Sequence, residues 1–180
     1  WRPAEGRVPT LLMRLPYGKD VLPVTGSGSL IVSLVAFLRA GYAVVVQDVR
    51  GAFQSEGVFT AKVNEHTDGR ETIEWIARQP WSDGTVGAYG PSYLGMVQWA
   101  AASEAPAALK AIAPAVAAMN WHEGLWYSPG GAMSLSIVNW WHASMYMAEA
   151  RRELAAGKGD VAELTALGGF FGAGLAAHNF

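Results

Sequence analysis

Two kinds of segment alternate along the first two thirds of the chain. Short apolar runs rich in β-branched or small residues predict buried strands at residues 10–15, 43–47, 86–89 and 109–113. Between them, apolar residues recur at helical spacing and predict a helix that begins near Ser29 and others over 68–79 and 93–103. Since parallel strands need crossover connections, this alternation predicts a mostly parallel, doubly wound α/β sheet.

The character of the chain changes after about residue 117. The segment that follows is rich in tryptophan, tyrosine and methionine, and its spacing predicts a long helix over 134–155. We therefore expect two regions, an α/β core over residues 1–117 and a helical region over residues 118–180.

Composition narrows the classes of partner. The 180 residues are 51% hydrophobic and 16% charged, with a formal net charge of −2, which predicts a globular protein with no basic surface for nucleic acid. The longest apolar run, 105–119, is too short and interrupted to span a membrane. The absence of cysteine excludes a thiolate metal site and fits a reducing compartment. Because no signal peptide is visible in these residues, a cytoplasmic location is favoured. We expect a small-molecule substrate, no metal and no cofactor.

The segment 90–95, Gly-Pro-Ser-Tyr-Leu-Gly, links a predicted strand to a predicted helix. Hydrolases place a nucleophilic serine on such a sharp turn, usually within Gly-x-Ser-x-Gly. Here Leu94 stands where the second glycine is expected, and the glycine is displaced to Gly95. Ser92 is therefore a candidate nucleophile, and the alternative is a serine that caps the following helix.

Ligands bind beyond the carboxyl ends of the strands in parallel sheets. Three candidate residues follow or end the predicted strands there, namely Tyr17, Asp48 and Ser92. This common location predicts one site at that edge of the sheet.

Four segments, in order along the chain, resemble the cocaine esterase and X-Pro dipeptidyl-peptidase family of serine hydrolases. They are Arg-Leu-Pro-Tyr-Gly-Lys at 14–19, Asp-Val-Arg-Gly with Ser-Glu-Gly over 48–57, the run through Ser92 over 79–95, and Tyr-Ser-Pro-Gly-Gly at 127–131. The resemblance implies a partial α/β-hydrolase fold, in which residues 118–180 begin a helical cap. It also implies cleavage of esters or amides through an acyl-enzyme.

Roles for individual residues follow. Ser92 would attack, and the backbone N–H of Tyr93, the residue after the nucleophile, would bind the oxyanion. By resemblance, the Tyr17 phenol supplies a second oxyanion donor, and Trp126 and Trp141 line the acyl pocket. The alternatives are a turn tyrosine packed on the core and tryptophans that only pack. Asp48 and Arg50 are expected to organise the loop beneath the site.

The acid and the base are not evident in this sequence. Asp160 and His178 have the order expected after the serine, but no pair of strand signals follows residue 113 to carry them. His66, His122 and His142 are expected to be surface or packing residues. We therefore expect an amino-terminal piece of a longer protein, with the acid, the base, the rest of the sheet and a jelly-roll domain beyond residue 180. The piece alone is expected to be inactive.

An incomplete sheet has an unpaired edge, which leaves homo-oligomer formation open. Among the activities, an esterase or acylase is favoured over an X-Pro dipeptidyl-peptidase, because no acidic pair is placed to receive a free amine. A non-catalytic α/β binding scaffold is the alternative from another class. A dinucleotide-binding domain is disfavoured, since no Gly-x-Gly-x-x-Gly follows the first predicted strand.

Overall fold

The computed structural model describes residues 1–3, 5–20, 34–120, 126–166 and 168–169. The chain divides into two compact units, Trp1–Met119 and Asn120–Phe180. The division falls close to the change in character seen in the sequence, while the assignment of residues 118–180 to a cap stays a prediction.

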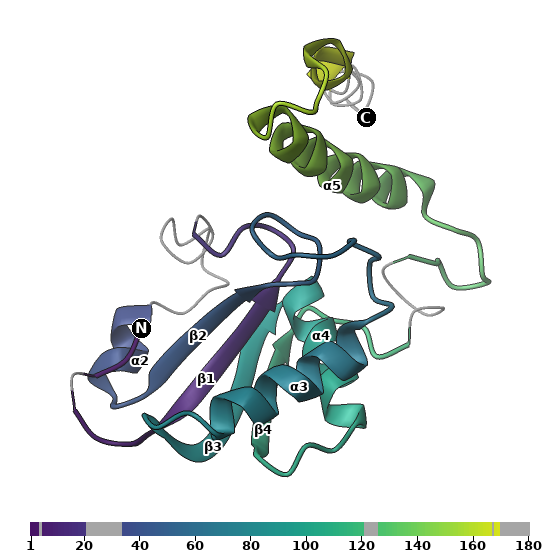
Figure 1. The fold of residues 1–180 in the computed structure, drawn as a ribbon. Coiled ribbons are helices and arrows are strands. Elements are labelled where there is room, and N and C mark those ends of the chain that lie inside the picture. Colours follow the sequence, from purple (N-terminus) through teal and green to yellow (C-terminus); the bar gives the residue numbers. More distant parts are fainter. Residues whose placement is uncertain (4, 21–33, 121–125, 167, 170–180) are drawn as a thin grey trace. The chain divides into compact units, whose positions relative to one another are not determined.

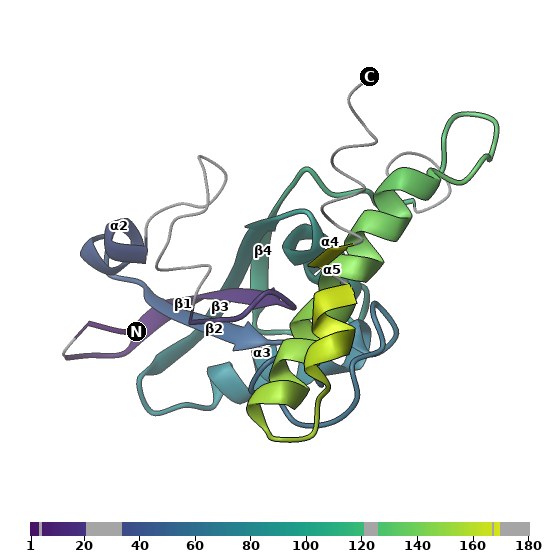
Figure 2. The ribbon, with the colours of Figure 1, turned by 90° about the horizontal axis from the view of Figure 1, so that it is seen from above.

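Four parallel strands form the sheet of the first unit, in the order β2-β1-β3-β4. They are β1 (Val8–Leu15), β2 (Ala43–Asp48), β3 (Ser82–Pro91) and β4 (Leu109–Ala115). Seen from above, the strands turn progressively from β2 to β4, the usual twist of such sheets (Figure 2). Because all four run in one direction, their carboxyl ends lie along one edge, as the sequence predicted.

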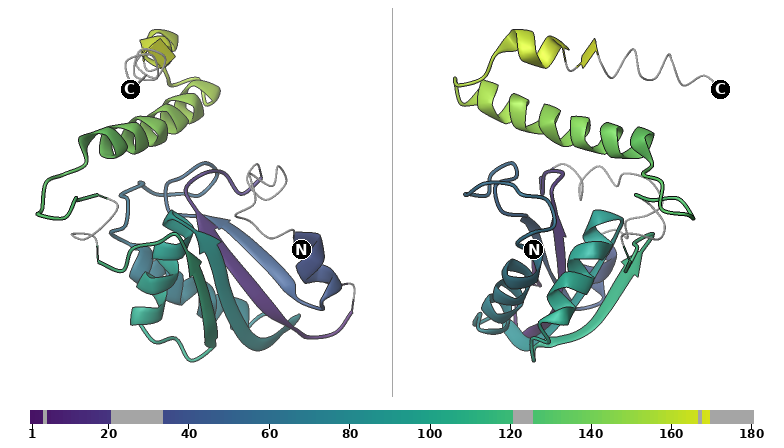
Figure 3. Two further views of the ribbon diagram at one scale, coloured as in Figure 1. Left: turned by 180° about the vertical axis from the view of Figure 1, so that it is seen from behind. Right: turned by 90° about the vertical axis from the view of Figure 1, so that its right-hand side faces the viewer.

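Helices cover both faces of this sheet. Helices α3 (Glu65–Ala77) and α4 (Tyr93–Ser103) lie side by side on one face (Figures 1 and 3). The core under them is formed by Leu12, Ile73, Ile76, Val86, Ala88 and Ala101. On the opposite face, the ring of Phe37 in α2 (Leu34–Arg39) contacts the ring of Tyr89 edge-on, with the ring centroids 4.9 Å apart. Tyr89 follows Ala88, so its side chain points to the other side of the strand. The doubly wound α/β prediction is confirmed.

Several predicted bounds need correction. Strand β1 begins two residues earlier than predicted, at Val8, and β3 and β4 each end two residues later, at Pro91 and Ala115. Strand β3 begins at Ser82, four residues earlier than predicted, because Ser82 pairs with Val8 of β1. Helix α3 covers Glu65–Ala77 instead of 68–79. Helix α4 has the predicted bounds. The helix expected from Ser29 is observed over Leu34–Arg39, and its predicted beginning lies outside the described residues.

The second unit contains helix α5 (Leu135–Ala155), a continuous helix of 21 residues that Figure 3 shows from the side. Residues 161–166 are also helical. Among the residues that the structure describes, no helix combines the length and the apolar character needed to cross a membrane.

Candidate active site

Ser92 lies between β3 and α4 in a conformation that few residues other than glycine adopt. Its φ is 55° and its ψ is −123°, which costs roughly 1–3 kcal/mol and is found where the surrounding structure imposes it. Its N–H donates to the carbonyl of Ala115 at 2.8 Å, and its carbonyl accepts the N–H of Met96 at 3.0 Å. Although Ser92 is at the N-cap position, its side chain makes no capping hydrogen bond. The capping alternative is therefore not what the structure has.

Two glycines make this turn sterically possible. Gly90 has φ +134°, and a Cβ there would lie 2.7 Å from the Cβ of Leu94. A Cβ at Gly95 would lie 2.5 Å from the Cβ of Ala117 and 3.3 Å from the carbonyl oxygen of Ala115. Position 95 thus has no room for a side chain against the chain at the end of β4, which is a steric reason for a glycine at this position.

The side chain of Gln98 supports the turn at Ser92 through hydrogen bonds, a role that the sequence pattern did not predict. Its buried side chain donates through Nε2 to the carbonyls of Gly90 at 3.1 Å and Leu94 at 2.8 Å. Its Oε1 accepts the N–H of Ala113 at 3.0 Å. One side chain therefore connects β3, α4 and β4. A single amide within an otherwise apolar helix is the signal that would have singled it out.

The structure brings Tyr17 next to Tyr93. Tyr17 lies in the turn after β1, and β1 pairs with β3, the strand that leads to Ser92. The two tyrosine rings meet edge to face, with centroids 6.4 Å apart and an interplanar angle of 74°. Three of the five residues predicted for the site, Tyr17, Ser92 and Tyr93, thus share one corner of the first unit.

A buried polar network anchors the side chain of Tyr93. Its hydroxyl donates to Oε1 of Glu65 at 2.8 Å and accepts the backbone N–H of Lys62 at 3.0 Å. Glu65 forms an ion pair with Arg14 at 2.8 Å, and both side chains are buried. Arg14 also donates from Nε to Gln47 at 2.8 Å. Burial, and then the Glu65 carboxylate, raises the pKa of Tyr93 far above its usual range, so the phenol stays protonated and donates.

Asp48 is the last residue of β2, and Arg50 lies in the loop that follows. Oδ1 of Asp48 accepts the N–H of Lys19 at 2.7 Å, in the turn that contains Tyr17. Arg50 donates from Nε to Asp68 at 2.9 Å and so ties the loop to α3. One contact joins the end of β2 to the turn after β1 and the other joins the loop after β2 to α3, in keeping with the organising role expected for both residues.

Trp126 and Trp141 belong to the second unit, where they pack against each other. Their ring centroids lie 5.7 Å apart at an interplanar angle of 82°, and both side chains are buried. The His142 ring contacts both, with its centroid 6.1 Å from that of Trp126 and 5.2 Å from that of Trp141. The predicted role of the two tryptophans in an acyl pocket stays a prediction.

Within the described ranges, no histidine forms a hydrogen bond with Ser92. Nδ1 of His66 shares a hydrogen bond with Ser103 at 2.9 Å, and Nδ1 of His142 lies 2.8 Å from the carbonyl oxygen of Val138. Asp160 accepts the N–H of Ala162 at 2.8 Å and so caps a helical turn. His122 and His178 lie outside the described residues.

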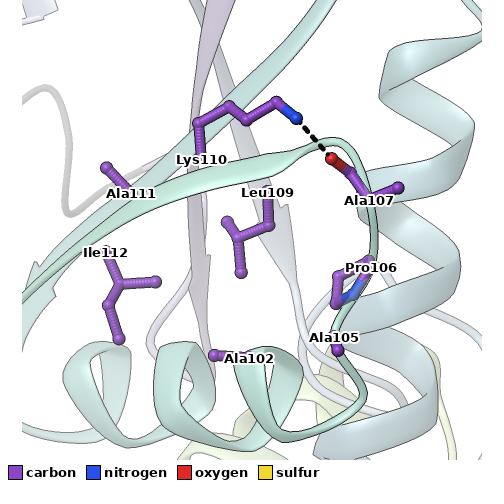
Figure 4. A pocket seen from close by; sticks show the side chains of 8 residues that line it. All are labelled: Ala102, Ala105, Pro106, Ala107, Leu109, Lys110, Ala111 and Ile112. Carbon is purple, nitrogen blue, oxygen red and sulfur yellow. Dashed lines mark hydrogen bonds between the residues drawn. The ribbon is translucent and has the colours of Figure 1, made fainter.

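In the described part of the chain, no group of three or more histidine, aspartate or glutamate side chains is arranged to hold a metal ion. An open groove of about 450 Å³ lies beside the amino-terminal half of β4. Figure 4 shows its lining of small apolar side chains and Lys110, whose Nζ donates to the carbonyl of Ala107 at 2.7 Å. The groove is at the opposite end of β4 from Ala115, and hence from Ser92, and has none of the predicted site residues.

In this unit a strand of a parallel sheet leads into a helix through a serine that has a strained backbone and does not cap the helix. This arrangement defines a unit of the α/β-hydrolase type. The chain belongs to the X-Pro dipeptidyl-peptidase (S15) family, whose sequence pattern residues 1–168 match.

Relatives with known names agree with this family. Cocaine esterase of Rhodococcus sp. (strain MB1 Bresler) is 46% identical over 145 residues, which cover 79% of this chain and 25% of that protein. The structure of an α-amino acid ester hydrolase matches with a TM-score of 0.60 and 28% identity, over 72% of this chain and 24% of that one. A CocE/NonD family hydrolase from Staphylococcus aureus matches with a TM-score of 0.56 and 32% identity, over 62% and 23%. The chain thus spans about a quarter of the length of these relatives.

Proposed function

We propose that the protein is a cofactor-independent serine hydrolase that cleaves esters or amides through an acyl-enzyme, with Ser92 as the nucleophile. The observation that carries this proposal is the strained backbone of Ser92 together with the absence of a capping hydrogen bond from its side chain. A serine that served only the helix would cap it from an unstrained conformation. The strain at Ser92 instead suits a hydroxyl held out for attack.

In the proposed reaction, Oγ of Ser92 attacks the substrate carbonyl while a histidine base takes its proton. The carbonyl oxygen becomes an oxyanion, which accepts hydrogen bonds from the backbone N–H of Tyr93 and the phenol of Tyr17. The contact between the two tyrosine rings supports this pairing. Each donor is worth roughly 3–4 kcal/mol, or 100- to 1,000-fold in kcat. We assign the base and its acid partner to the part of the protein beyond these 180 residues.

The tetrahedral intermediate collapses as the ester C–O or amide C–N bond breaks, and the base gives the proton from Ser92 to the leaving alcohol or amine. In the second half of the reaction the base takes a proton from water, whose oxygen attacks the acyl carbon. The base passes that proton to Oγ of Ser92 as the carboxylic acid product leaves. We assign Trp126 and Trp141 to the acyl side of the substrate, where a flat apolar surface suits an aromatic or aliphatic acyl group. Of the activities named among the relatives, we favour ester hydrolysis or acyl transfer over release of X-Pro dipeptides. A dipeptidyl-peptidase must bind a free ammonium group, and the buried acid near Ser92, Glu65, is already paired with Arg14.

The decisive experiment is labelling of the natural protein with a fluorophosphonate, with the modified residue located by peptide mass spectrometry. We expect a single label on Ser92 and none in Ser92→Ala. Ser103→Ala is the matched control, because Ser103 contacts a histidine, His66, yet has no part in the proposed site. Labelling of Ser103→Ala should equal that of the natural protein. A folded natural protein that takes no label would favour the non-catalytic scaffold.

Substrates of different chemistry distinguish the activities within the family. Activated esters, amino-acid esters and X-Pro anilides share the acyl-enzyme step and differ in whether a free amine must be bound. We expect kcat/KM to be higher for the simple esters than for the X-Pro anilides. A preference for the anilides would assign the protein to the peptidases.

A further inference from the structure

Asp48 lies beside the turn that carries Tyr17. It ends β2 and is in register with Leu15, the last residue of β1. Its side chain is buried, and Oδ1 accepts the backbone N–H of Lys19 at 2.7 Å. At the beginning of the same turn, the N–H of Val49 donates to the carbonyl of Leu15 at 3.0 Å. Tyr17 therefore lies between two points that are both anchored to β2 and the residue after it.

The loop after β2 closes over this turn through further contacts. A Cβ on Gly18 would lie 3.0 Å from the ring of Phe53, so ring and turn are packed together. Nζ of Lys19 donates to Oε1 of Gln54 at 2.6 Å. Within the loop, Oγ of Ser55 donates to the carbonyl of Asp48 at 2.7 Å. These contacts join the loop and the turn into one packed structure with Asp48 at its centre.

The charge of Asp48 strengthens its hold on the turn. Hydrogen bonds to a carboxylate are roughly twice as strong as those between neutral groups. Burial raises the pKa of Asp48, whereas the backbone N–H groups of Lys19 and Gln54 and the Lys19 ammonium lower it. The Lys19 ammonium lies 3.9 Å from Oδ2. The pKa of Asp48 is raised overall, so these groups offset the desolvation of the carboxylate only in part.

We infer that Asp48 is a positioning residue of the hydrolase, which aims the phenol of Tyr17 at the oxyanion by fixing the turn at Lys19. This inference rests on the proposed function. The backbone N–H of Tyr93 is set by α4, whereas the position of the Tyr17 phenol depends on the turn to which the Tyr17 backbone belongs. A displacement of 1 Å at a reacting centre costs about 100-fold in rate, so loss of the anchor is felt in kcat.

A double-mutant cycle in the natural protein tests this inference with an activated ester. Tyr17→Phe is expected to lower kcat by about 100- to 1,000-fold. Asp48→Ala is expected to lower it about 10- to 100-fold, with KM within about threefold. In the Tyr17→Phe background, Asp48→Ala should then have almost no further effect. Asp48→Asn keeps an acceptor oxygen for the N–H of Lys19 and should restore most of the lost kcat.

Asp83→Ala is the matched control. Asp83 also accepts a backbone N–H, that of Thr85 at 2.8 Å, but in the amino-terminal half of β3, so kcat should stay within about twofold. If Asp48→Ala lowered kcat equally with and without the Tyr17 phenol, Asp48 would act independently of Tyr17 and the inference would be overturned. An unchanged kcat in Asp48→Ala, or in Tyr17→Phe, would overturn it as well.

Should Asp48→Ala fail to fold, Asp48→Leu keeps the branched shape at Cγ, with methyl groups in place of the acceptor oxygens, and allows the same comparison. The proposed function fails in a different way, by absence of the fluorophosphonate label on Ser92. A labelled, active protein without coupling between Asp48 and Tyr17 would therefore refute the positioning role alone.

Discussion

Gly95 offers a direct test of the steric argument for the nucleophile turn. Replacing it with alanine places a Cβ 2.5 Å from the Cβ of Ala117 and 3.2 Å from the carbonyl oxygen of Gly90. Carbon atoms in contact are normally separated by about 3.5–4.0 Å. A Cβ is bound directly to the backbone and cannot rotate away, so α4 and the chain after β4 must separate by about 1 Å.

The energetic consequences are larger for catalysis than for folding. Overpacking of this kind costs about 1–3 kcal/mol, and the better helix propensity of alanine offsets up to about 1 kcal/mol of that loss. We therefore expect Gly95→Ala to lower the free energy of unfolding by about 0–2 kcal/mol. A shift of about 1 Å at Ser92 is instead expected to lower kcat by about 100-fold.

The assay combines ester turnover, the rate of fluorophosphonate labelling and urea unfolding of the natural protein. Gly69→Ala is the matched control, because its Cβ would lie 2.6 Å from the Cβ of Ala101 near the other end of α4. It should destabilise the protein by a similar amount and keep kcat within about threefold. Ala117→Gly removes the nearest atom and should restore much of the kcat lost in Gly95→Ala. Equal kcat values for Gly95→Ala and Gly69→Ala would refute the reasoning.

Three further predictions concern the first unit and the chain as a whole. Gln98→Met removes the buried hydrogen bonds that connect β3, α4 and β4, and should lower the free energy of unfolding by about 2–4 kcal/mol. Gln79→Met, at a half-buried residue whose hydrogen bond to the Trp75 carbonyl is exposed, should change it by less than about 0.5 kcal/mol. Equal effects in urea unfolding would contradict the role given to Gln98. Burial lowers the pKa of Lys62 from 10.5 to about 8, so between these pH values the unfolded state binds more protons and stability rises with pH. The free energy of unfolding of Lys62→Met, measured in urea, should therefore exceed that of the natural protein at pH 7, and the difference should shrink toward pH 10.5. A difference that stays constant with pH would contradict the lowered pKa of Lys62. The isolated 180 residues should turn over esters about 10⁶-fold more slowly than the natural protein, because we assign the base and the acid to the part of the protein outside them. Ester turnover by the isolated residues that Ser92→Ala abolishes would contradict this.

Local patterns were sufficient for most of the fold. The bounds of α4 were predicted correctly because it begins at a sharp turn and its apolar run ends at Ser103. Helix α3 was misplaced by three residues at its start. Glu65, its first residue, is held by Arg14 and by the hydroxyl of Tyr93, partners far away in sequence. No local pattern contains that information.

The sequence by itself determined the parallel α/β class and the position of the serine turn. Both depend on steric rules that act over a few residues, namely the apolar periodicity of each element and the small residues around Ser92. Only the tertiary structure decided what supports that turn and the neighbouring turn with Tyr17. Gln98 and Glu65 act on the first and Asp48 on the second, through residues that are distant along the chain or on other elements. Which polar residue meets which backbone group depends on strand order and register, and these are settled when the whole sheet packs.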